Sequence, residues 1–260
     1  MGSSKVITLI TDFGTRDTYV GQMKGVIISI NPHALIIDIT HEIEPQDIRE
    51  AAFLIREYYP FFPKGTIHVA VVDPDVGSHR RPLLVKKDGH FFVGPDNGIF
   101  TMILKDNLEI FTIENRGFTL KNISNTFHGR DIFAPVAAYI SRGLDISLLG
   151  RMIEDPILLQ NIYPRVEQET LYGEIVRFDR FGNAITNIDA STFKGFTGER
   201  RFRIEVGEIH FDSLCSSYFE GVMVCLVGSS GYLEFGYYKD SFRERTGVKK
   251  GEKVTVRTIF

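Results

Sequence analysis

Residues 67–81 read IHVAVVDPDVGSHRR, and this stretch decides how the rest of the chain is interpreted. The apolar, β-branched run at 67–72 predicts a buried strand. It ends at Asp73-Pro74, because proline lacks the N–H that a strand ladder needs and favours a turn. The stretch therefore brings carboxylates, a histidine and two arginines to the carboxyl end of a strand, where ligands usually bind in open α/β sheets. An Asp-Pro pair is also typical of an ordinary turn with solvated charges. Other parts of the sequence have to decide between a ligand site and such a turn.

Strand-like and helix-like patterns alternate over the first part of the chain. Strands are expected at 6–10, 35–39 and 67–72, and helices at 19–30, 47–58 and 131–141. Asp131 is the expected N-cap of the last helix. This alternation predicts βαβ units and an α/β domain with a mostly parallel sheet. The short runs 83–85 and 90–93 are close enough together to predict a hairpin.

After Tyr163-Pro164 the pattern changes to short strands separated by turn residues. These strands are expected at 171–178, 183–188, 201–206, 222–227, 232–238 and 253–259. We therefore expect two domains: an α/β domain at 1–162 and a smaller all-β, barrel-like domain at 163–260.

Composition excludes several classes of protein. The net charge of the 260 residues is −3, which argues against nucleic-acid and membrane-surface partners. Two cysteines, Cys215 and Cys225, suit neither a zinc ribbon nor a disulfide framework. No signal peptide or long apolar run is visible, so a cytoplasmic protein is expected. Phosphate-loop, dinucleotide-binding, serine-hydrolase and HExxH motifs are absent from the sequence.

Polar clusters follow several of the apolar runs. Asp12, after the first strand, suits either ribose hydroxyls or the N-cap of the next helix. His128 stands just before a predicted helix, whose positive end favours the neutral imidazole; a surface loop histidine is the alternative. The clusters at 94–98, 179–183 and 228–232 are each typical of a turn.

Together these clusters resemble the S-adenosyl-L-methionine (SAM) hydroxide adenosyltransferases, relatives of the fluorinase and chlorinase. The resemblance rests on TDFG at 11–14, DPxVGxxR at 73–80, GPDNG at 94–98, TFHGRD at 126–131 and FGNxxTNI at 181–188. It implies an α/β domain followed by a β-barrel, and a homotrimer whose active sites lie between subunits. It also implies the reaction, in which SAM and water give adenosine and methionine, with SAM as a small-molecule substrate and no cofactor or metal.

The resemblance also assigns roles to residues. Asp73, Arg80 and His128 match the family's catalytic set, in which Asp73 and Arg80 would hold each other while Arg80 and His128 position and polarise the water. The remaining matches are substrate-binding positions: Asp12 for the ribose diol, Asn183 for the adenine edge, Asp179 and Ser229 for the methionine end, together with Phe13, Asn97 and Phe127.

A halide-using relative is one alternative function. The halogenases replace the catalytic set and carry an extra loop after the region that matches Asn97, whereas this chain keeps all three residues and leaves no room for the loop at 100–109. Water is therefore the expected nucleophile.

Two positions depart from the family pattern: Asp75, where glycine is common, and Ser230, where the fluorinase has arginine.

Two further alternatives come from other classes. In a metal-dependent hydrolase, Asp73, Asp75, His79 and His128 would form a nitrogen and oxygen ligand set. In a non-catalytic adenosine or SAM sensor, the same pocket would bind without turnover. Retention of Arg80 and His128 argues weakly against the sensor, because binding alone does not require them.

Overall fold

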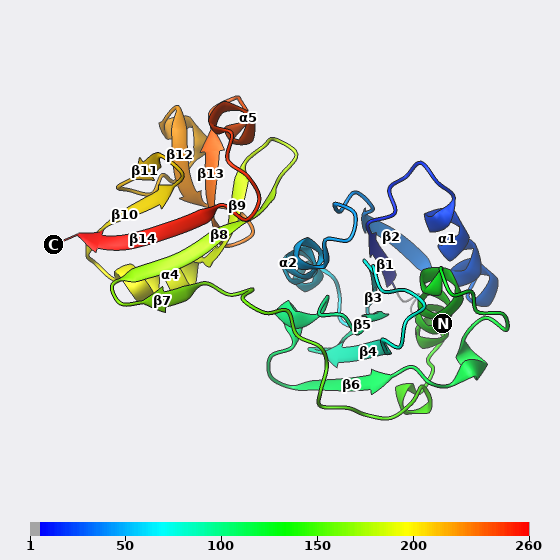
Figure 1. The fold of residues 1–260 in the computed structure, drawn as a ribbon. Helices are drawn as coiled ribbons and strands as arrows, with labels where there is room; N and C mark the ends of the chain where they lie inside the picture. Colours follow the sequence, from blue (N-terminus) through cyan, green and yellow to red (C-terminus); the bar gives the residue numbers. More distant parts are fainter. Residues whose placement is uncertain (1–5, 260) are drawn as a thin grey trace. The chain divides into compact units, whose positions relative to one another are not determined.

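The computed structural model describes residues 6–259, and the chain divides into two compact units between Leu159 and Gln160 (Figure 1). Each unit encloses its own hydrophobic core. Within residues 6–259, no helix combines the length and the apolar character that crossing a membrane requires.

The first unit alternates strands and helices up to β3 and then adds antiparallel strands. Its strands are β1 (Val6–Thr11), β2 (Leu35–Thr40), β3 (Ile67–Val71), β4 (Pro82–Lys87), β5 (His90–Pro95) and β6 (Leu108–Thr112). Its α-helices are α1 (Tyr19–Ile30), α2 (Ile48–Tyr58) and α3 (Ala134–Ser141), and a π-helical turn, Gly129–Phe133, leads directly into α3. Short 3₁₀ turns lie at Tyr59–Phe61, Thr101–Ile103, Arg116–Phe118 and Ile146–Leu148.

The sheet of the first unit has the order β2-β1-β3-β5-β4-β6 and is mixed. The pairs β1–β2, β1–β3 and β3–β5 are parallel, whereas β4 is antiparallel to both β5 and β6. The prediction of a mostly parallel sheet is therefore not confirmed. The reason is the hairpin between β4 and β5, in which Asp88 and Gly89 both have positive φ, as a tight two-residue turn requires.

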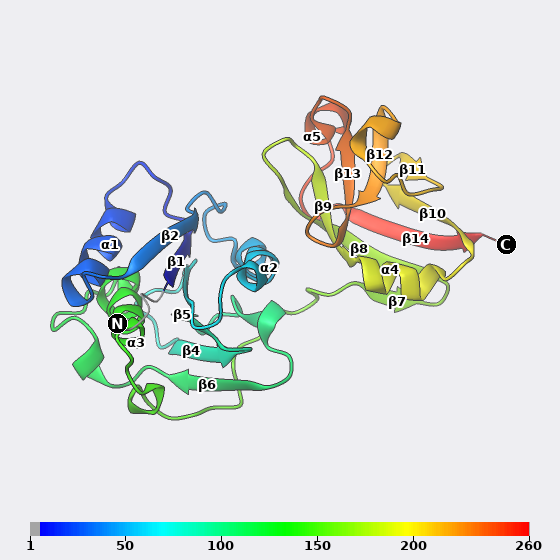
Figure 2. The same cartoon turned by 180° about the vertical axis from the view of Figure 1, so that it is seen from behind.

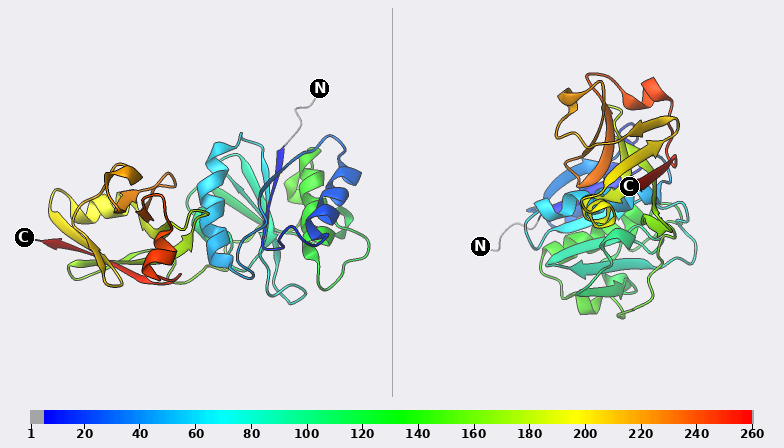
Figure 3. Two further views of the ribbon diagram at one scale, coloured as in Figure 1. Left: turned by 90° about the horizontal axis from the view of Figure 1, so that it is seen from above. Right: turned by 90° about the vertical axis from the view of Figure 1, so that its left-hand side faces the viewer.

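Helices cover both faces of this sheet. In the left view of Figure 3, α1 and α3 lie together on one face and α2 lies on the other. Met23 and Ala137 pack against Leu9 and Val69 in the core on the first face, and Phe53 is fully buried on α2. Because β1, β2, β3 and β5 are parallel, they end at one edge of the sheet, and the loops that follow them gather there.

The second unit is a nearly closed, barrel-like antiparallel sheet with the order β11-β10-β14-β8-β9-β13-β12 (Figure 2). Its strands are β7 (Arg165–Glu167), which pairs with β8, β8 (Thr170–Phe178), β9 (Ala184–Asp189), β10 (Arg201–Val206), β11 (Ile209–Phe211), β12 (Met223–Val227), β13 (Tyr232–Tyr237) and β14 (Lys253–Ile259). The barrel-like character predicted for this part of the chain is confirmed.

Two short helices, α4 (Ala190–Thr197) and α5 (Phe242–Thr246), correct the prediction that this unit is all-β, and a 3₁₀ turn lies at Tyr218–Glu220. Helix α4 forms because the Asp189 carboxylate accepts hydrogen bonds from the N–H groups of Ser191 and Thr192. Helix α5 is capped in the same way by the Ser241 hydroxyl, which accepts from the Glu244 N–H.

Candidate active site

The centre of the candidate site is an ion pair between Asp73 and Arg80. Asp73 follows β3, and Arg80 lies at the end of the turn that leads to β4. Arg80 Nε donates to Asp73 Oδ1 at 2.9 Å, and Nη2 donates to Oδ2, so both carboxylate oxygens are bound. Only 4–5% of either side chain is exposed. A bidentate pair of this kind fixes both groups in one orientation.

Gly77 makes the turn between these two residues possible. Its φ is +83°, and an added Cβ would lie 2.2 Å from the backbone oxygen of Asn125. Both facts require glycine, because other residues disfavour this φ and no side chain fits against the neighbouring backbone. The glycine of the DPxVGxxR stretch thus allows the turn to pass close to the loop that carries His128.

Arg80 also connects the ion pair to His128. Its Nη2 lies 2.8 Å from His128 Nδ1. Since a guanidinium can only donate, Nδ1 must be the acceptor and the proton of the neutral ring is on Nε2. Burial, followed by the charge of Arg80, holds the pKa of His128 below its ordinary value. The structure therefore brings Asp73, Arg80 and His128 together, with His128 neutral.

The loop that carries His128 is held by Asp131. This carboxylate is fully buried and accepts hydrogen bonds from both the N–H and the hydroxyl of Ser124, each at 2.8 Å, and from Arg130 Nε at 2.7 Å. Asp131 was predicted to be the N-cap of α3, and this is wrong: it lies inside the π-helical turn, three residues before the helix begins. Its hydrogen bonds instead close the loop 124–131.

A cavity of about 490 Å³ adjoins the pair Arg80 and His128. Polar groups on its wall include Ser78, Arg116 and Asn125. Among the residues that the structure describes, Arg80 Nη1 is buried and has no hydrogen-bond partner. An N–H of a buried cation is costly to leave unpaired, so this donor indicates a place for an oxygen ligand.

Asp12 follows β1 at the same sheet edge. Its Oδ2 accepts from the Gln46 N–H at 2.8 Å. It does not cap α1, which begins at Tyr19 after Thr18, so that alternative is wrong. Burial raises the pKa of Asp12, the bond from Gln46 lowers it, and the nearby charge of Asp73 raises it further.

Aromatic rings pack together close to this position. The ring of Phe13 contacts those of Phe127 and Tyr19, with centroids 5.7 and 5.8 Å apart, and the Tyr19 and Phe127 rings are 5.2 Å apart. Phe127 is buried and Phe13 is partly exposed. The three rings form one aromatic cluster, which includes the residue that follows Asp12 in the chain.

Asn97 follows β5 and is buried. Its Nδ2 donates to the Val72 carbonyl at 2.9 Å, and its Oδ1 accepts from the Ile99 N–H at 3.2 Å. The amide thus holds the backbone just before Asp73. This geometry supports a positioning role for Asn97. Direct binding of the substrate by Asn97 stays a prediction.

The second unit contains a cavity of about 490 Å³ beside Asn183. Three aromatic and four polar residues form its wall: Phe181, Asn183, Tyr218, Tyr237, Lys239, Asp240 and Ser241. Asp179 accepts from the Asn183 N–H at 2.8 Å and from Asn183 Nδ2 at 2.9 Å, which orients the amide. Ser229 lies in the exposed turn between β12 and β13. Tyr218, which sequence reasoning did not single out, donates to the buried carboxylate of Glu234.

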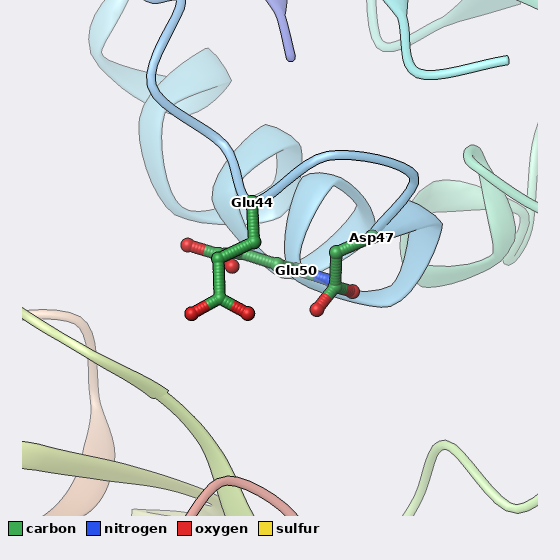
Figure 4. Close-up of side chains that lie close together, drawn as sticks. All are labelled: Glu44, Asp47 and Glu50. Atoms are coloured by element: carbon green, nitrogen blue, oxygen red, sulfur yellow. The ribbon is translucent and has the colours of Figure 1, made fainter.

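The ligand set of the metal-dependent alternative is not assembled around Asp73, because Asp75 and His79 are exposed and the Asp73 carboxylate is bound by Arg80. Within residues 6–259, the one group of three or more ligand side chains whose donor atoms all lie within 4.8 Å of one another is Glu44, Asp47 and Glu50 at the start of α2 (Figure 4). These are surface carboxylates. Asp47 serves as the N-cap of the helix and accepts from the Glu50 N–H.

Comparison with known proteins places this geometry in a family. The N-terminal domain model of the SAM hydroxide adenosyltransferases matches residues 7–150, and the C-terminal domain model matches residues 173–255. The chain belongs to the SAM hydroxide adenosyltransferase family. Both of its structural units are thus matched by the two domains of one family.

Several relatives are similar to this chain over nearly their full length. A protein of Methanocaldococcus jannaschii named (R)-S-adenosyl-L-methionine hydrolase is 38% identical, over 96% of this chain and 95% of the relative. One of Thermus thermophilus with the same name is 36% identical, over 95% and 98%. A fluorinase of Actinoplanes is 25% identical over 96% and 97%. The crystal structure of an uncharacterized conserved protein from Thermotoga maritima superposes with a TM-score of 0.88 at 35% identity, over 97% of this chain and 99% of that one.

Proposed function

We propose that this protein hydrolyses SAM by attack of a water-derived oxygen on the ribose C5′, giving adenosine and methionine. The observation that carries the proposal is the buried guanidinium of Arg80, which binds Asp73 and His128 and keeps its Nη1 group without a protein partner. Support comes from relatives named SAM hydrolase at 36–38% identity, against 25% for a fluorinase.

The reaction places its demand on the nucleophile. A C5′–O bond forms while the C5′–S bond breaks, and its electron pair returns to sulfur to give a neutral thioether. No general acid is needed for such a leaving group. The protein has to orient the attacking oxygen and favour its hydroxide-like form.

His128 acts in this scheme as a donor. Its Nδ1 lone pair is used by Arg80, so the ring presents only Nε2–H to the nucleophile. Both oxygens of Asp73 are bound by Arg80, and we assign the carboxylate the role of orienting this guanidinium. Arg80 and His128 therefore stabilise negative charge on the attacking oxygen, and the proton of the water leaves to solvent instead of to either side chain.

The remaining predicted residues suit the other parts of SAM. The Asp12 carboxylate would accept from the ribose hydroxyls, beside the aromatic cluster that contains Phe13 and Phe127. Asn183 would bind the adenine edge, since an amide can both donate and accept, and it lines a partly aromatic cavity. Asp179 and Ser229 would bind the ammonium and carboxylate of the methionine end, and Asn97 the region near Asp73.

We further propose that the protein works as a cytoplasmic homotrimer that needs no resident metal or cofactor and takes only small-molecule ligands. Support for assembly comes from apolar side chains on the second unit, where Phe181 and Phe219 are each 75% exposed and Val222 is 65% exposed. Association of subunits would remove such side chains from water. Light scattering of the purified protein should give a mass of three chains, and a monomer with full activity would refute the trimer.

The test of the proposed function is to incubate the purified protein with SAM and identify the products by mass spectrometry. We expect adenosine and methionine, at a rate that a chelator does not change. Reactions with chloride or fluoride should give the same products. A 5′-halo-adenosine would instead identify a halogenase, and intact SAM despite binding would identify a sensor.

Matched variants separate the catalytic set from the metal ligand set. Arg80→Ala and His128→Ala should abolish most turnover. Asp75→Asn and His79→Ala should leave the rate unchanged, because both side chains are exposed and belong only to the metal scheme. Loss of activity in the second pair, together with sensitivity to a chelator, would favour the metal-dependent hydrolase.

A further inference from the structure

The loop that carries Asp12 is fastened to the loop that follows β2. His41 is the first residue of that second loop and makes two of the contacts. Its carbonyl accepts from the Gly14 N–H at 2.7 Å, and its Nδ1 lies 2.8 Å from the Thr11 hydroxyl. The third contact is the bond from the Gln46 N–H to the Asp12 carboxylate. Residues on both sides of Asp12 are therefore held by His41.

The direction of these hydrogen bonds can be worked out. The Phe13 N–H donates to Thr11 Oγ1 at 3.2 Å, which leaves the hydroxyl hydrogen for His41 Nδ1. The other nitrogen, Nε2, lies 3.1 Å from Asp38 Oδ1. Its N–H is poorly aligned with that oxygen, so the contact is electrostatic more than a good hydrogen bond. The carboxylate favours the proton on Nε2, which again leaves Nδ1 as the acceptor.

The surroundings of His41 make this arrangement rigid. The side chain is 4% exposed. Thr11, at the end of β1, is fully buried. Asp38 is itself held by an ion pair with Lys24, and although burial raises its pKa, the hydrogen bond from Lys24 and the proximity of His41 bring the pKa below its ordinary value. A buried group with fixed partners on both sides can transmit position to its neighbours.

We propose that His41 is a positioning residue for substrate binding, which sets the orientation of Asp12 and Phe13 through the Thr11 hydroxyl. This inference rests on the proposed function, in which Asp12 binds the ribose diol. His41 itself does not touch the reacting atoms, and the catalytic set is held by separate contacts around Arg80. The expected signature is a loss of affinity for the nucleoside with little change in turnover at saturation.

The experiment measures KM and kcat for SAM hydrolysis, and the Kd of adenosine by calorimetry, in two variant pairs. Thr11→Val removes the hydroxyl and keeps the shape, whereas Thr11→Ser keeps the hydroxyl. His41→Leu removes both ring nitrogens, whereas His41→Asn keeps an acceptor near the position of Nδ1. The exposed His210 on β11 provides a control, as His210→Leu.

We expect KM and the adenosine Kd to rise about tenfold in Thr11→Val and His41→Leu, the effect of losing one buried hydrogen bond. kcat should change less than about threefold, because no interaction of the transition state is removed. Thr11→Ser and His41→Asn should recover most of the affinity, and His210→Leu should match the parent protein.

Some outcomes would overturn the inference. An unchanged KM in a folded Thr11→Val protein would do so, as would equal losses of affinity in Thr11→Val and Thr11→Ser. If His41→Leu does not fold, the Thr11 pair decides alone. Hydrolysis of SAM by the parent protein together with an unchanged KM in both variants would refute only the role of His41, whereas a parent protein that neither binds nor hydrolyses SAM would refute the proposed function as well.

Discussion

Arg80 Nη2 lies 2.8 Å from His128 Nδ1 while the same nitrogen donates to the Asp73 carboxylate. One guanidinium thus orients both a carboxylate and an imidazole. The centroid of the Phe133 ring lies 5.4 Å from Arg80 Cζ. Lysine cannot reproduce this arrangement, because an ammonium has no planar fork.

Arg80→Lys is therefore expected to lower kcat about 10²- to 10³-fold, although the positive charge is retained. Steady-state kinetics with SAM would show this as a fall in kcat with a small change in KM. Exposed Arg16 offers a control, since Arg16→Lys should have no effect. A near-normal kcat in Arg80→Lys would mean that a positive charge alone is enough for catalysis and that the planar guanidinium is not needed.

The activity should depend on pH through His128. Its pKa lies below the ordinary histidine value because of burial and the charge of Arg80. Protonation at Nδ1 would break the bond from Arg80 and place two cations together, so kcat/KM should stay constant near neutral pH and fall only on the acid side, below about 6.5. Activity that instead rises on acidification would contradict the assignment of His128 as a neutral donor.

Stability should fall with acid through His68, a second buried histidine. Burial, and then the proximity of His90, lower its pKa to about 3. The unfolded chain binds this proton near pH 6.5 and the folded protein does not, so the contribution of His68 is full above about pH 6.5 and is lost as pH falls toward 3. The loss is on the order of 5 kcal/mol, and urea unfolding at several pH values measures it.

A matched variant isolates this contribution. His68 stacks on Phe92, with ring centroids 4.8 Å apart, and its Nδ1 lies 2.8 Å from the Thr8 hydroxyl. His68→Phe keeps the ring and removes the titration, so the slope of stability with pH should flatten between pH 3 and 6.5. An unchanged slope would assign the acid sensitivity to other groups.

Asn97 can be tested as a positioning residue, because its side chain forms hydrogen bonds only to backbone groups. Asn97→Ala would leave the Val72 carbonyl unpaired in a buried place and should lower the free energy of unfolding by about 1–3 kcal/mol. Thermal unfolding measures this directly. A stable variant with a raised KM would show that Asn97 contacts the substrate instead.

Gly77→Ala should be strongly disruptive, since the new Cβ would lie 2.2 Å from the Asn125 oxygen at a φ of +83°. We expect a loss of stability of more than about 1 kcal/mol and a large loss of kcat, because Arg80 would be displaced. Gly21→Ala in α1 is the control, as its Cβ meets nothing within 4 Å. It should stabilise the protein by about 0.5–1 kcal/mol. Equal behaviour of the two variants would contradict the role of the turn.

The sequence could predict the parts of the site that depend on local patterns. Asp12 and Asp73 follow apolar strand runs, and parallel strands carry both to one edge of the sheet, as the structure shows. Strands β6, β7 and β11 and helices α4 and α5 were missed. Helix α4 contains a glycine and two threonines, so its propensity is weak, and Asp189 was the one local signal for it.

Side-chain pairs between distant loops could not be predicted in this way. The contact between Thr11 and His41 joins two loops, and no periodic pattern reports which side chains meet. Asp131 misled for a related reason. An aspartate before an apolar run is typical of an N-cap, but a π-helical turn extends the helix backward and buries the carboxylate. The family resemblance placed Arg80 and His128 around the same water, but the direct contact between Arg80 Nη2 and His128 Nδ1 was not predicted.

The spacing of the catalytic set has a consequence for how the protein folds. Asp73 and Arg80 are seven residues apart and share a turn, whereas His128 is 48 residues beyond Arg80. Closing the longer loop costs about 1.7 kcal/mol more chain entropy than closing the shorter one. Chain entropy therefore favours closing the turn between Asp73 and Arg80 over closing the loop to His128, and the catalytic set is complete only when this more distant segment has docked.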